Sequence, residues 1–363
     1  MNLRDTNEIN SDRNELREAI FKVVAFFDMF DCPLTAFEIW KYLPVKCELD
    51  EVMAALNESR IMLIPLTPFR RGLESKNGFY FLPSRNVLYD LRMARYNFTS
   101  RKFGQAIKIA CIFKLVPWIK MIALSNIIGA NNAKEGSDID LFILTENKKI
   151  WLTRFFCLTI LKLFGLRPTT EKQKDKICLS FFISEGAMDL KKLMLDASAQ
   201  KEYKKPERLD NDKTRPSFLT RESTGTVASD TRYAIRDTYF IYWLACLVPI
   251  YDRDETYARL LGSNRWFGQA LPNWEMTINS NWRDIGRPLS FFYRDLVDIF
   301  CGGLEKFFMK QQMKRLPGQI KNMINKDTRV VVNEEIIKTH TNDRREEYRE
   351  KFLAKLNEIN NKF

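Results

Sequence analysis

The sequence predicts an α+β protein in which helices cover a small mixed sheet. Three observations predict this class. Several long stretches repeat apolar residues at helical spacing, short apolar runs between polar turns are typical of strands, and 45% of the 363 residues are hydrophobic, which is enough for a sizeable core. A chain of this length is sufficient for two or three domains.

The first 97 residues predict a winged helix-turn-helix domain. Apolar residues at helical spacing predict a helix over Asp12–Phe27. Thr35 and Glu38 have the spacing of a capping box, in which two side chains satisfy backbone amides at the start of a short helix. The domain is completed by a third helix and two extended segments: Leu49–Ser59, Ile61–Ile64 and Phe79–Leu82.

Many winged helices bind DNA, but the charge of this one argues against it. The helix that would enter the major groove has Glu48, Asp50, Glu51 and Glu58 against a single basic residue, Arg60. Such a helix is normally basic because it lies among phosphates. We expect this module to bind a protein partner or to be structural, and a DNA-binding regulator is the second alternative for the whole chain.

Residues 98–200 predict the mixed sheet itself. Short apolar runs that end at a polar loop are expected to be strands, and longer amphipathic runs are expected to be helices. The expected elements are a helix, two strands, a second helix and a third strand: Leu88–Phe113, Ile119–Leu124, a strand from Ser137, Lys149–Gly165 and Ile177–Ser184.

The remainder of the chain predicts a polar linker followed by a helical domain. Residues 201–232 have few large apolar side chains, which is typical of a linker. Residues 233–363 are expected to be predominantly helical, and their longest apolar stretch, Tyr239–Tyr251, is shorter than the roughly 20 residues of a membrane span. We therefore expect a buried helix at that stretch and no membrane partner.

Composition excludes several classes of function. The seven cysteines are scattered and form no CxxC pair, which argues against a disulfide framework or a thiolate zinc site and favours the cytoplasm. The only histidine is His340, so catalytic triads and two-histidine metal motifs are excluded. An enzyme with this composition has to rely on carboxylates.

The excess of positive charge lies in the later part of the chain. Residues 1–99 contain 13 basic and 14 acidic side chains, whereas residues 100–363 contain 45 basic and 32 acidic ones. Positive charge attracts polyanions. We expect a nucleotide, and RNA or another anionic acceptor, to bind after residue 100.

One segment has the pattern of a metal site. Asp138 and Asp140 lie at the start of an expected strand, and alternate strand residues point to the same face, so the two carboxylates project together. Neighbouring carboxylates repel each other unless a cation lies between them. Oxygen ligands of this kind favour Mg²⁺.

This segment resembles the nucleotidyltransferase superfamily related to DNA polymerase beta. The family motif is a strand that ends in Gly-Ser, a spacer of about ten residues, and an Asp-apolar-Asp strand. The run AKEGSDIDLFILT, after Asn131 and Asn132 and before Trp151–Arg154, is similar to the form in uncharacterised bacterial proteins with an N-terminal winged helix. The resemblance covers 118–154 and extends more loosely to the N-terminal module and to residues 249–274.

The resemblance implies transfer of a nucleoside monophosphate from a nucleoside triphosphate to a hydroxyl, with release of pyrophosphate. It implies that Asp138 and Asp140 are the catalytic ligands of Mg²⁺ or Mn²⁺. Asn126 and Ile127 occupy the family's Gly-Ser positions, so the nucleotide contacts are expected from the surrounding loop. The expected contacts are Ser125, Asn126, Gly129, Lys134 and Ser137.

The family's third carboxylate comes from a later strand. The matching position in Ile177–Ser184 is Ser180, and Glu185 at the end of that strand is the acid expected to complete the metal site. The missing Gly-Ser pair and the missing acid favour a first alternative, a binding or regulatory protein that keeps the nucleotidyltransferase fold without turnover.

Overall fold

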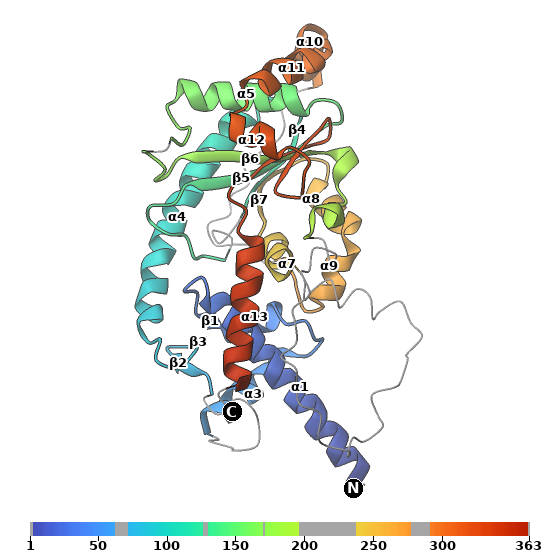
Figure 1. Cartoon of the computed structure of the whole chain (residues 1–363). Coiled ribbons are helices and arrows are strands. Elements are labelled where there is room, and N and C mark those ends of the chain that lie inside the picture. Colours follow the sequence, from blue (N-terminus) through green and yellow to red (C-terminus); the bar gives the residue numbers. More distant parts are fainter. Residues whose placement is uncertain are drawn as a thin grey trace.

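The fold is α+β, as the sequence predicts, and Figure 1 shows the chain as a computed structural model. The structure describes residues 3–61, 72–125, 130–169, 171–195, 237–276 and 291–361. The expected linker at 201–232 lies outside these residues. Among the described helices, none is long and apolar enough to cross a membrane.

The N-terminal region contains three helices and a small antiparallel sheet. The helices are α1 (Leu3–Asp28), α2 (Ala36–Lys41) and α3 (Leu49–Ile61), and the strands β1 (Leu34–Thr35), β2 (Glu74–Lys76) and β3 (Phe79–Phe81) pair in the order β1-β3-β2. The capping box is confirmed, because Thr35 Oγ1 accepts from the Glu38 amide at 3.2 Å and the Thr35 amide donates to the Glu38 carboxylate at 2.8 Å. Most of the expected Ile61–Ile64 segment lies outside the described residues.

A single long helix joins this region to the central sheet. Helix α4 (Val87–Phe113) runs through the predicted boundary at residue 97, so that boundary falls inside one continuous element. Arg95 on α4 donates to the Phe30 carbonyl and to Asn132 Oδ1, each at 2.9 Å. The guanidinium therefore ties the turn after α1 to the loop that precedes the Asp-x-Asp strand.

The central sheet has six strands in the order β7-β4-β5-β6-β9-β8. Strands β5 and β6 are parallel, and the other neighbours are antiparallel. The bounds are β4 (Ile119–Leu124), β5 (Ile139–Thr145), β6 (Ile177–Ser184), β7 (Val248–Asp252), β8 (Val330–Val332) and β9 (Ile336–Thr339).

The C-terminal region, predicted to be predominantly helical, also contributes strands to the central sheet. Strands β7, β8 and β9 come from that region and complete the central sheet on both sides. The stretch Tyr239–Tyr251 is buried but is only partly helical, since α7 (Thr238–Ala245) ends before β7 begins. Short apolar runs do not distinguish a buried helix from a strand, and the pairing partner of β7 is β4, more than 100 residues away.

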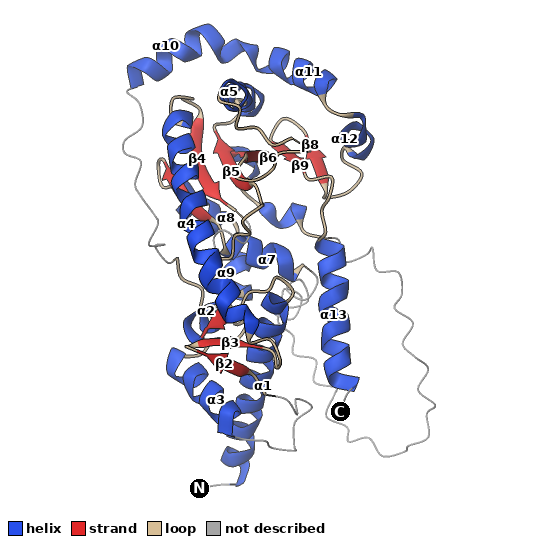
Figure 2. Ribbon diagram, turned by 90° about the vertical axis from the view of Figure 1, so that its left-hand side faces the viewer, coloured by secondary structure: helices blue, strands red, loops and turns tan. Residues whose placement is uncertain are grey.

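Two hydrophobic cores lie on opposite faces of the sheet (Figure 2). One face packs against α4, α5 and α11. The other face packs against α7, which in turn packs against α1, and α13 runs from the sheet alongside α1. The Phe352 ring of α13 lies 5.4 Å from that of Phe26. The remaining helices are α5 (Ile150–Leu163), α8 (Thr256–Ser263), α9 (Arg265–Ala270), α10 (Phe291–Cys301), α11 (Glu305–Arg315), α12 (Gly318–Met323) and α13 (Arg345–Asn361).

Candidate metal centre

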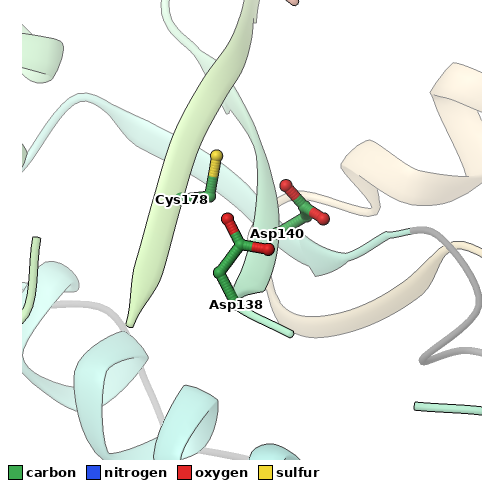
Figure 3. A group of neighbouring side chains, drawn as sticks. All are labelled: Asp138, Asp140 and Cys178. Atoms are coloured by element: carbon green, nitrogen blue, oxygen red, sulfur yellow. The ribbon is translucent and has the colours of Figure 1, made fainter. Parts of the chain in front are cut away.

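Two carboxylates and a thiol meet where β5 and β6 begin (Figure 3). Asp140 lies opposite Cys178 in the parallel pairing, and Asp138 immediately precedes β5. One ligand atom from each of Asp138, Asp140 and Cys178 lies within 4.8 Å of the others. Ile139 between the two aspartates is fully buried, as strand alternation requires.

The backbone around this group is fixed from two sides. The Ser125 amide at the end of β4 donates to the Asp140 carbonyl at 3.1 Å. On the other side, the buried Lys102 of α4 donates to the Ser137 carbonyl at 2.6 Å and to Asp175 at 2.7 Å. The position of the Asp138 backbone is therefore set by groups from α4 and β4.

The pKa values of Asp138 and Cys178 are both raised. Burial raises the pKa of Asp138, opposed by its own backbone hydrogen bond and by nearby Lys102. Burial and the charges of the two aspartates raise the pKa of the Cys178 thiol well above its usual range. A divalent cation would relieve this repulsion and favour the thiolate.

The donor set fits a divalent cation of intermediate hardness. Mg²⁺ prefers oxygen ligands alone, whereas thiolates are preferred by softer ions. Asp138 and Asp140 supply the oxygens and Cys178 supplies sulfur. The two carboxylates suit Mg²⁺ or Mn²⁺, and of these two expected ions the softer Mn²⁺ tolerates a sulfur ligand better.

The structure places two of the five expected nucleotide contacts, Ser125 and Ser137, beside the group. Ser125 and Ser137 flank the aspartates, and the Ser137 hydroxyl donates to the carbonyl of Lys134 at 3.0 Å, which stabilises the turn before Asp138. The Lys134 side chain is exposed. Asn126 and Gly129 lie outside the described residues.

Glu185 does not join the group formed by Asp138, Asp140 and Cys178, contrary to the prediction. It lies in the short helix Glu185–Ala187 that follows β6. Because β5 and β6 are parallel, the end of β6 lies beside Thr145, at the opposite end of β5 from Asp140. There Glu185 accepts from Arg259 at 2.7 Å and lies 4.0 Å from Lys120.

Sequence reasoning missed two residues beside the metal group. Cys178 was overlooked because the expected third ligand was an acid. The second residue is His340, which directly follows β9. Its Nε2 atom lies 2.8 Å from the hydroxyl oxygen of Ser180. No local pattern marks His340, since its position depends on the pairing of β6 with β9.

A cavity of about 190 Å³ opens beside Asp140. Its walls come from β5, β6, the segment from β9 to α13, and α7, and they combine aromatic rings with charged groups. The lining residues are Asp140, Phe181, Tyr239, Phe240, Trp243, Lys338, His340, Asn342, Asp343, Arg344, Arg345 and Tyr348.

Comparison with known proteins adds no relative. No protein-family model, no curated protein and no solved structure matches the chain.

Proposed function

We propose that the protein is a nucleotidyltransferase that uses Mg²⁺ or Mn²⁺ to move a nucleoside monophosphate from a nucleoside triphosphate to an acceptor hydroxyl. The observation that carries this proposal is the group formed by Asp138, Asp140 and Cys178 beside the cavity. The resemblance of residues 118–154 to the polymerase beta superfamily supports it. So does the order of β4, a loop, and β5 beginning at the aspartates, which is the layout expected for that family.

The chain's own groups have distinct roles in this proposal. Asp138, Asp140 and Cys178 would hold the cation, which when bound neutralises phosphate charge and activates the attacking hydroxyl. Ser125 and Ser137 flank the ligands and would contact the phosphates. Lys134, exposed on the same loop, would meet the leaving pyrophosphate.

The N-terminal region is proposed to be a winged helix that docks a protein. Three helices with a three-stranded sheet suit that fold, and its third helix is acidic. A groove of about 680 Å³ between α1 and α3 includes Arg13, Arg17, Glu51 and Glu58. This mixture of charges suits a protein partner better than a nucleic-acid backbone.

One observation favours a second candidate, a nucleotide-binding protein without turnover. The third position of the metal group is the thiol of Cys178 instead of a carboxylate. Fewer charged oxygens hold a catalytic Mg²⁺ less tightly. Binding without pyrophosphate release would identify this candidate.

The test is release of pyrophosphate from each of the four ribonucleoside triphosphates with Mg²⁺ or Mn²⁺, with and without short RNA acceptors. We expect release that depends on the cation and is lost in the double variant Asp138→Asn, Asp140→Asn. The single variant Glu185→Gln is the matched control, because that acid lies at the other end of the strands. Equal release by the double variant would refute the proposal.

A further inference from the structure

Helices α10 and α11 lie at one end of the molecule, outside α5, in both Figure 1 and Figure 2. One side of this pair of helices packs inward. The ring of Phe308 on α11 lies 4.1 Å from that of Phe155 on α5, and Asp298 on α10 accepts from Trp118 Nε1 at 2.9 Å. These contacts fix the two helices to the body of the protein and determine which side faces solvent.

The outward side of α10 and α11 is apolar. Ile299 is 78% exposed, Phe300 73% and Phe307 54%, and Leu296 and Leu304 are also exposed. The positions follow one another at steps of three or four residues along α10, α11 and the turn between them, so the side chains share one side. Contiguous exposed apolar side chains mark interaction surfaces. We call these five residues the apolar strip.

Exposed lysines border the apolar strip. Lys306, Lys310 and Lys314 repeat at every fourth residue on the solvent side of α11. None of the three forms an ion pair with any residue that the structure describes. Phe307 precedes Lys310 by three positions, so its ring lies on the same side as the lysines. Asp295 is an exposed acid on α10, and the balance of charge along the strip is therefore positive.

Apolar side chains bordered by lysines suit an anionic lipid surface. In helices that lie on a bilayer, the apolar side chains enter the boundary of the acyl chains and the basic ones meet the headgroup phosphates. A second copy of the chain suits the strip less well, because a two-fold contact would bring the lysines of both copies together. Single-stranded RNA would use the lysines and the two rings but not the aliphatic side chains of Leu296, Ile299 and Leu304.

We propose that α10 and α11 bind the surface of an anionic bilayer, with the apolar strip at the headgroup boundary and Lys306, Lys310 and Lys314 among the phosphates. The expectation of no membrane partner concerned a spanning helix at Tyr239–Tyr251. Helices that lie in the plane of the surface need no such length.

This surface is separate from the metal group. Asp298 of α10 contacts Trp118, which precedes β4, and lies 2.6 Å from Lys149, which follows β5. Asp140 lies at the other end of β5. A bilayer and a metal ion would therefore bind in different places, and the proposal does not depend on the proposed function.

The test is cosedimentation of the full-length protein with vesicles of phosphatidylcholine alone or of phosphatidylcholine and phosphatidylglycerol in equal parts. We expect binding to the mixed vesicles that weakens as salt is raised, and little binding to the neutral ones, because the lysines need anionic headgroups. No binding to the mixed vesicles, or equal binding to both kinds, would overturn the proposal.

Two sets of substitutions separate the apolar and the basic contributions. The double variant Phe300→Ser, Phe307→Ser is expected to weaken binding to the mixed vesicles about a hundredfold, since each inserted ring contributes about tenfold. Replacement of Lys306, Lys310 and Lys314 by Gln is expected to cost about fivefold for each lysine and to remove the preference for anionic vesicles. Wild-type binding by either variant would contradict the role of that group.

Val87→Ser is the matched control. Val87 is 69% exposed and apolar, but it lies at the end of α4 beside the N-terminal sheet, away from α10 (Figure 1). Vesicle binding by this variant should equal that of the wild type. If Val87→Ser weakened binding as much as the double variant, apolar contact would be unspecific and the proposal would be wrong.

Size-exclusion chromatography and titration with oligouridine test the other occupants of the strip. A dimer that dissociates in the variant Phe300→Ser, Phe307→Ser, without vesicle binding by the wild type, would assign the strip to a second copy. An affinity for oligouridine that this variant loses, again without vesicle binding, would assign it to RNA. Either result would overturn the proposal.

Discussion

The two ends of β5 and β6 bear acidic groups in opposite electrostatic settings. At the ends of the strands, Glu185 and Asp254 lie close to cations: Arg259 contacts Glu185 at 2.7 Å and Lys120 contacts Asp254 at 2.6 Å. At the starts of the strands, Asp138 has Asp140 and a thiol within 4.8 Å. Acids of similar chemistry are therefore paired at one end and crowded at the other.

Two of these acids, Asp254 and Asp138, have pKa values shifted in opposite directions. The hydrogen bond from Lys120 lowers the pKa of Asp254, whereas burial raises the pKa of Asp138. An acid whose cation is supplied by the protein is a structural ion pair. An acid that is buried beside another acid is a candidate ligand for a cation from solution. The comparison thus separates Asp138 from Glu185, which the sequence places in the same role.

The largest expected effect is loss of the response to metal and nucleotide. In the wild type, Mn²⁺ with a nucleoside triphosphate at 100 times its dissociation constant should stabilise the protein by about 2.7 kcal/mol, because only the folded state binds them. The double variant Asp138→Asn, Asp140→Asn should show no metal-dependent rise in melting temperature. Its metal-free melting temperature should not fall, because the substitutions relieve repulsion. If metal still raised the melting temperature of this variant, the claim that the cation binds at the starts of β5 and β6 would be wrong.

Local patterns in the sequence were sufficient to predict the pair of aspartates, the capping box and the bounds of two strands. Strand alternation placed Asp138 and Asp140 on one face, and the capping box of Thr35 and Glu38 formed as its spacing predicts. Strands β4 and β6 have the bounds expected from their apolar runs.

The rest depended on how distant segments pair. The direction of β6 relative to β5 determines that Cys178, at its start, joins the aspartates and that Glu185, after its end, does not. A strand, helix and strand in succession favour parallel pairing, and that pairing places the start of β6 beside the aspartates. The place of His340 was not accessible, because it follows from the pairing of β9 with a strand about 155 residues earlier.

The second effect concerns the stability of the protein in acid, which depends on His340 in the wall of the cavity beside Asp140. His340 has a pKa of about 4 in the folded protein, against an ordinary value of 6.5. Between these values the unfolded chain binds the extra proton, so the free energy of unfolding should rise with pH from 4 to 6.5, by about 3 kcal/mol from this group. Urea unfolding of wild type and His340→Gln over this range isolates the contribution. Parallel curves for the two proteins would contradict the lowered pKa.

The third effect sharpens the role of the thiol. Cys178→Asp places a third carboxylate beside Asp138 and Asp140. Because a hard cation prefers charged oxygen ligands, the affinity for Mg²⁺ should rise about tenfold. The preference for Mn²⁺ over Mg²⁺ should therefore become smaller. Cys178→Ser is the matched control, because it supplies oxygen without charge and should weaken Mn²⁺ binding. Metal affinities follow from the melting temperature as a function of metal concentration. An unchanged ratio of Mn²⁺ to Mg²⁺ affinity in both variants would show that residue 178 is not a ligand.

The smallest expected effect is that of Glu185→Gln, at the paired end of the strands. This substitution removes the charge that meets Arg259, whose side chain is 48% exposed. A partly exposed ion pair contributes about 0.2–1 kcal/mol, so the free energy of unfolding should fall by no more than that and less at high salt. The metal-dependent rise in melting temperature should equal that of the wild type, because Glu185 and Asp140 lie at opposite ends of the paired strands. A reduced metal response in Glu185→Gln would mean that the acid reaches the cation in the bound state, and the two ends would then form one site.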